Sequence, residues 1–179
     1  YNRDYELRKP ELREAYHLSK WVNKAPRDDS RELVNARTGS DSDGLTLSMI
    51  IGTDIDQTAI TSGNLIRHWQ ENGRNYFHYK THQTIINFYP IVSARYELFQ
   101  EDHIPAGNEN ANSVSLEIYY HEDHTHNLNR MMNGMKASLD YYSSHFSPYQ
   151  YHQLRIVEFP RYRTYAQSFP NTIPFSEAL

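Results

Sequence analysis

The sequence predicts an α+β fold that is mostly β, and three observations support this prediction. Residues 113–160 have the pattern of a strand, a helix and a second strand. Asn72 and Gly73 lie between two strand-like runs, and this dipeptide is a strong hairpin signal because both residues accept positive φ. The chain also has 15 tyrosines against 7 phenylalanines, which favours thin layers of half-buried aromatic rings.

Composition excludes several classes of protein. The net charge is −4 and no basic block exists, so the phosphate neutralisation that nucleic-acid binding requires is not available. No apolar run approaches the ~18 residues of a membrane-spanning helix. The chain has no cysteine, which excludes disulfides and thiolate metal sites. It begins with Tyr1 rather than methionine, so we expect it to be processed or cut from a longer protein.

The first half is expected to be an arm followed by strands. Residues 1–43 are charged and irregular and predict an arm or linker, with a short helix over 9–16 that has Pro10 in its first turn. Alternating apolar residues predict a strand over 45–53, and the stretch 54–63 is interpreted as a connection. A hairpin then joins 65–70 to 75–80.

The region that follows is rich in β-forming residues as far as Gln100. Pro90 interrupts it, and proline cannot donate to a central ladder, so it marks an edge, a bulge or a change of sheet. Residues 101–112 are polar and are interpreted as a linker. We therefore expect a β-sheet region over 44–100 and a second region over 113–179.

The second region is expected to open with a strand–helix–strand unit. Apolar and polar residues alternate over 114–120, and a helix is predicted over about 125–146, ending before Pro148. Apolar side chains recur at helical spacing on its inner face: Leu128, Met131, Met132, Met135, Leu139 and Tyr142. A strand over 153–159 follows, and 161–179 is expected to be extended with one short strand.

Three histidines lie close together between the first strand and the helix of this unit. His121, His124 and His126 alternate with acidic residues, and imidazole with carboxylate suits zinc or nickel. Their spacing matches no standard site, and HExxH is absent. The favoured interpretation is a solvated loop whose acids face the positive end of the helix, with a metal site as the weaker alternative.

Several blocks of the sequence resemble one known family. They are residues 69–80, 128–136, 155–160 and 168–179. Together they resemble the aminopeptidase N-like zinc metallopeptidases, or gluzincins. The most similar branch is bacterial and joins such a peptidase region to the permease of an ABC transporter. The resemblance covers about 44–179.

The resemblance implies an architecture and a metal. Residues 44–100 would be the last strands of an antiparallel, saddle-like β domain, and 113–179 would open a thermolysin-like catalytic domain. In the family, the HExxH helix and a third ligand, a glutamate, lie further along the chain. The resemblance therefore implies no catalytic residue and no cofactor within these residues, and zinc in the parent protein.

The resemblance also assigns a role to Glu177. The family carries the motif Gly-Ala-Met-Glu-Asn, whose glutamate holds the free amino group of the substrate. The matching positions here, 174–178, read Pro-Phe-Ser-Glu-Ala, so only the glutamate agrees. Glu177 is thus implied to recognise the peptide amino terminus in the parent.

The function implied is that of a non-catalytic fragment of a bacterial, membrane-associated zinc metallopeptidase. The parent would hydrolyse peptides from the amino terminus. The chain would be a soluble domain of an inner-membrane protein on its periplasmic face. Its partners would be the rest of the parent chain, the transporter subunits and the peptide substrate, with no nucleic acid. The alternative is a non-catalytic binding or scaffold module of the transporter that docks a partner or a peptide.

Overall fold

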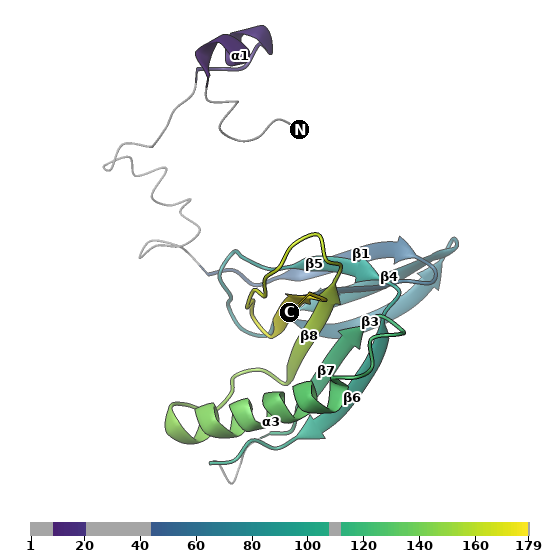
Figure 1. The fold of residues 1–179 in the computed structure, drawn as a ribbon, viewed down its shortest axis with the longest axis vertical. Coiled ribbons are helices and arrows are strands. Elements are labelled where there is room, and N and C mark those ends of the chain that lie inside the picture. Colours follow the sequence, from purple (N-terminus) through teal and green to yellow (C-terminus); the bar gives the residue numbers. More distant parts are fainter. Residues whose placement is uncertain (1–8, 21–43, 108–111, 179) are drawn as a thin grey trace. The chain divides into compact units, whose positions relative to one another are not determined.

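A computed structural model describes residues 9–20, 44–107 and 112–178 (Figure 1). The chain divides into two units between Asp43 and Gly44. In the first unit the described element is helix α1 (Pro10–Ala15), which has the predicted proline at its first turn. The rest of the expected arm, 1–8 and 21–43, lies outside the described residues. All the elements that follow belong to the second unit.

The predicted hairpin is confirmed within an antiparallel three-stranded sheet. Its strands are β1 (Ser48–Asp54), β3 (Asn64–Glu71) and β4 (Arg74–Lys80), in the order β1-β4-β3. Asn72 and Gly73 form the turn with φ of 50° and 72°, the left-handed conformations that a two-residue hairpin turn requires.

A two-stranded sheet contains an element that the sequence did not predict. Strand β2 (Thr58–Thr61) lies within the expected connection and pairs with β5 (Ile91–Ala94). Four residues are too few to show a period, yet Ile60 is fully buried. Pro90 was expected at an edge, a bulge or a change of sheet, and it directly precedes β5, which lies in another sheet than the preceding strand β4. The Pro90 carbonyl accepts a hydrogen bond from the Thr61 hydroxyl (2.6 Å).

The third sheet has four strands in sequence order. They are β6 (Glu97–His103), β7 (Val114–Tyr120), β8 (Gln153–Phe159) and β9 (Thr172–Ser176). β6 and β7 are antiparallel, whereas β7, β8 and β9 are parallel. The expected domain boundary in 101–112 stays a prediction; its first three residues continue β6, which pairs with the strand after the boundary.

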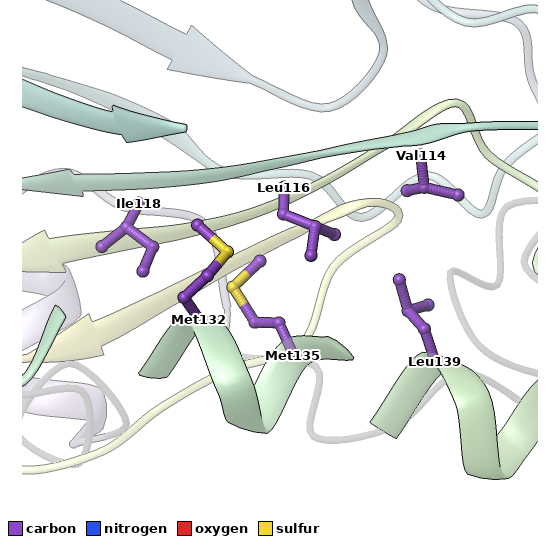
Figure 2. Packing of buried hydrophobic residues seen from close by; sticks show 6 residues of the cluster. All are labelled: Val114, Leu116, Ile118, Met132, Met135 and Leu139. Atoms are coloured by element: carbon purple, nitrogen blue, oxygen red, sulfur yellow. The ribbon is translucent and has the colours of Figure 1, made fainter. Parts of the chain in front are cut away.

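Helix α3 (Leu128–His145) joins β7 to β8 and covers one face of this sheet. The predicted methionine-lined face is confirmed, since it packs on alternate residues of β7 (Figure 2). The prediction was wrong for Tyr142, which is exposed near the end of the helix. The six buried side chains of this core are Val114, Leu116, Ile118, Met132, Met135 and Leu139. The mostly β fold with a strand–helix–strand unit therefore agrees with the sequence prediction.

The other face of β8 packs toward the two-stranded sheet. Val157 forms a buried cluster with Ile60 of β2 and Tyr119 of β7. Arg155 is also buried there, and its guanidinium donates to the Glu117 carboxylate (2.6 Å) and to the Gly63 carbonyl (2.8 Å). Strand β8 is thus covered on both faces, which fixes the position of its end.

Candidate functional site

The parallel strands β7, β8 and β9 bring three functional side chains to one edge of the sheet. His124 lies in the loop after β7, Glu158 is near the end of β8, and Glu177 directly follows β9. One ligand atom from each residue lies within 4.8 Å of the others. The carboxyl ends of parallel strands are a common place for ligand sites, because loops from several strands converge there.

Glu158 is the buried member of this group. Its side chain is 5% exposed, and its carboxylate accepts hydrogen bonds from the Nδ1 of His124 (2.6 Å) and the backbone N–H of His121 (2.9 Å). The hydrogen bond to Glu158, followed by the negative charge of that carboxylate, raises the pKa of His124 above its ordinary value. The imidazole itself is 44% exposed.

Glu177 is exposed but held by the backbone. Its own N–H donates to the Phe159 carbonyl (3.0 Å), which continues the β8–β9 pairing by one residue. One oxygen of its carboxylate accepts the N–H of Arg161 (2.9 Å). These bonds keep the side chain beside the end of β8.

The three residues line a cavity of about 620 Å³. Its remaining walls combine apolar and polar side chains from β7, β9 and the start of α3: Tyr120, His126, Asn127, Leu128, Arg130, Met131 and Phe175. Two carboxylates and an imidazole at the wall of a cavity favour a cationic ligand, either a metal ion or an ammonium group.

Of the three histidines that the sequence grouped, His121 and His124 stay in contact, with their rings edge to face and the centroids 5.9 Å apart. The His121 ring stacks on Tyr96 (centroids 5.5 Å apart), and its Nε2 is buried without a hydrogen-bond partner among the described residues. His126 lines the cavity, with its Nε2 3.0 Å from the Asn127 amide. Only His124 joins the group with Glu158 and Glu177.

Glu158 was missed in the sequence. The feature that could have identified it is its position near the end of the second strand in a strand–helix–strand unit. Such strands are parallel, so their carboxyl ends adjoin.

Comparisons with known proteins give a structural likeness only. No family model matches the chain, and no curated protein matches its sequence. The M1 zinc metallopeptidase from Deinococcus radiodurans is similar in structure, with a TM-score of 0.64 and 13% identity over 75% of this chain. Aminopeptidase A from Legionella pneumophila, solved in complex with aspartic acid, is similar with a TM-score of 0.65 and 12% identity over 73%. The chain has an M1-type fold.

The chain spans 31% of the Deinococcus structure and 16% of the Legionella structure. The M1-type fold agrees with the coarser part of the predicted resemblance, the peptidase family. The resemblance implies the catalytic zinc centre in the parent, further along the chain, and the residues present do not fit that centre because the sequence holds no HExxH motif. The His124–Glu158–Glu177 group is therefore a different arrangement.

Proposed function

We propose that the chain is a non-catalytic part of a bacterial zinc metallopeptidase that hydrolyses peptides from the amino terminus. The observation that carries this proposal is the order of elements: antiparallel sheets, then a strand–helix–strand unit, in an M1-type fold. The parent would hold its catalytic zinc with an HExxH helix outside these residues, where the metal would activate a water for attack on the peptide carbonyl.

The parent sequence tests this origin directly. We expect HExxH and a later glutamate within about a hundred residues after Leu179, the reach of one further domain of ordinary size. The purified parent should then cleave aminoacyl substrates, and a chelator should abolish the activity. A parent without HExxH would contradict the peptidase proposal.

In this proposal Glu177 holds the free amino group of the peptide. Support comes from its position beside Glu158, because two carboxylates at the wall of one cavity attract an ammonium group. Such an ion pair fixes the register of the peptide. The cleaved bond is then always the same distance from the amino terminus.

The amino-group role is testable on the chain itself, in buffer with a chelator. A tripeptide with a free amino group should shift the NMR signals of residues that line the cavity, and the N-acetylated tripeptide should not. Glu177→Gln should weaken the binding, whereas Glu122→Gln, in the neighbouring loop, is the matched control. Equal binding of both peptides would exclude recognition of the amino group.

The link to a transporter is the finer part of the proposal. In the described ranges, no helix is long and apolar enough to cross a membrane. We therefore assign the membrane attachment to the parent, as a fusion with the permease of an ABC transporter, and place this domain on the periplasmic face. Protease added to spheroplasts should degrade the domain. Protection until the inner membrane is lysed would contradict this location.

A second candidate is a binding module without catalytic function. The observation that favours it lies on the last turns of α3, where Tyr141, Tyr142 and Phe146 are 53%, 60% and 73% exposed. Exposed aromatic side chains that cluster are typical of interface anchors. If the parent lacks HExxH, the Tyr142→Ser and Phe146→Ser variants should lose co-purification with the permease while keeping their fold.

A further inference from the structure

We propose that His124, Glu158 and Glu177 bind one divalent metal ion of the zinc class at the carboxyl edge of the parallel strands. This site is separate from the catalytic zinc of the proposed function, because all of its ligands lie within this chain. It shares Glu177 with the proposed amino-group site, so the metal ion and the peptide amino group are alternative occupants. It also departs from the sequence prediction that these residues hold no cofactor.

The geometry requires only a small rearrangement of the three side chains. One ligand atom from each side chain lies within 4.8 Å of the others. Ligands about 2.1 Å from zinc at tetrahedral angles lie about 3.4 Å apart. His124 Nδ1 and the Glu158 carboxylate, which lie 2.6 Å apart, must therefore separate by somewhat less than an ångström, while Glu177 adjusts its carboxylate to complete the group. The His124 ring and the Glu177 side chain are exposed, and only one oxygen of the Glu177 carboxylate is bound by the Arg161 N–H, so its other oxygen is available to a metal ion. Glu158 is fixed by the backbone N–H of His121.

The negative charge of the group favours a bound cation. The Glu158 carboxylate lies 2.6 Å from His124 Nδ1, and Glu177 adds a second carboxylate beside it. A divalent ion would balance the charge of both carboxylates, one of which is buried. Arg130 lines the same cavity, but the described residues include no ion pair between its guanidinium and either carboxylate.

The ligand set selects the kind of metal. One imidazole with two carboxylates suits zinc, cobalt or nickel, whereas calcium and magnesium prefer oxygen ligands alone. The cavity of about 620 Å³ in front of the group leaves space for water as the remaining ligand.

Calorimetric titration of the metal-free chain with Zn²⁺ tests the proposal, and Co²⁺ gives a second readout through its ligand-field absorption. We expect one ion per chain. His124→Ala and Glu177→Gln should each weaken the affinity at least tenfold, and circular dichroism should show that both variants stay folded. His126→Ala is the matched control, since this imidazole lines the same cavity outside the group, and it should bind like the unaltered chain.

Substoichiometric binding to the unaltered chain would overturn the proposal. So would a His126→Ala variant that loses as much affinity as His124→Ala, or a Glu177→Gln variant that loses none. The test is independent of the amino-group proposal, because it contains no peptide and the peptide experiment contains a chelator. Either can therefore fail without the other.

Discussion

A single buried arginine connects the two parts of the second unit. Arg155 is 2% exposed, and its guanidinium bonds the Glu117 carboxylate and the carbonyls of Thr61 and Gly63. It also lies over the ring of Tyr79, 5.3 Å from the centroid. Burial raises the pKa of Tyr79 to about 12, so this phenol stays neutral beside the ion pair.

Replacing this arginine should strongly destabilise the fold. Arg155→Met removes the cationic partner of the Glu117 carboxylate, whose side chain is 13% exposed, and leaves the Tyr119 hydroxyl (3.0 Å) as its donor. We expect the free energy of unfolding to fall by about 3–5 kcal/mol. Urea unfolding measures the change. The matched control is Arg95→Met, because Arg95 pairs with Asp56 in solvent and should change little. Equal effects of the two substitutions would refute the role of Arg155.

Asp140 makes stability depend on pH. Its carboxylate accepts the N–H of Ala106 and a hydrogen bond from His103, both at 2.8 Å, and these bonds lower the pKa of Asp140. A lowered pKa in the folded state means that the stabilisation is present above the unfolded pKa of about 3.9 and is lost as the pH falls through the folded value.

The Asp140→Asn variant should therefore be less stable than the unaltered chain at pH 7, and the difference should shrink below about pH 4. Because the Asp140 side chain is 39% exposed, we expect less than about 1 kcal/mol. Urea midpoints at pH 7, 5 and 3 provide the measurement. A difference that stays constant over this range would show that the carboxylate charge does not matter.

At the scale of single residues, the sequence predicted the residue types of the site better than it predicted which residues lie together. His124 and Glu177 were both named as candidates, for different roles. Nothing in the local pattern places them together, because they are 53 positions apart and meet only through the parallel register of β7, β8 and β9. Glu158 was missed since a lone acid within an apolar run has no local signal.

At the scale of elements, two glycines can be compared directly, one in the hairpin turn and one in helix α3. Gly73 has φ of +72° and Gly134 lies within helix α3, and neither would bring an added Cβ within 4 Å of other atoms. Only backbone conformation therefore distinguishes the two positions.

The same substitution should have opposite effects at these two glycines. Gly73→Ala should cost about 1–2 kcal/mol because alanine disfavours the left-handed region. Gly134→Ala should stabilise the protein by about 0.5–1 kcal/mol, since alanine has the higher helix propensity. Thermal unfolding of the two variants gives the sign of each change in stability. Two shifts in the same direction would contradict the argument.

Elements with strong local signals were predicted, and those defined by distant partners were not. Asn72-Gly73, the spacing of Met132, Met135 and Leu139, and Pro148 gave the hairpin and the helix within a few residues. Strand β2 has four residues, and its burial comes from Tyr79, Val157 and Tyr119, which lie elsewhere in the sequence. Its existence therefore depends on tertiary packing rather than on its own pattern.

At the scale of the whole molecule, the question is whether the second unit unfolds as one body or two. The turn before β3 is bound to the four-stranded sheet through Gly63. Its N–H donates to the Asn171 side chain (3.2 Å), and its carbonyl accepts from Gln153 (2.7 Å) and Arg155 (2.8 Å). The buried cluster of Ile60, Tyr119 and Val157 adds an apolar contact between the same sheets.

These bonds predict one cooperative transition across the sequence-predicted boundary at 101–112. In a Trp21→Phe background, fluorescence reports Trp69 on β3, and circular dichroism at 222 nm reports mainly α3. The two urea transitions should coincide. Arg155→Met should separate them, because it removes the charged contact that couples the sheets while leaving the core under α3 intact. If the fluorescence and circular dichroism transitions were already separate in the Trp21→Phe chain, residues 44–100 and 113–179 would fold as independent domains. The buried arginine would then stabilise one sheet only.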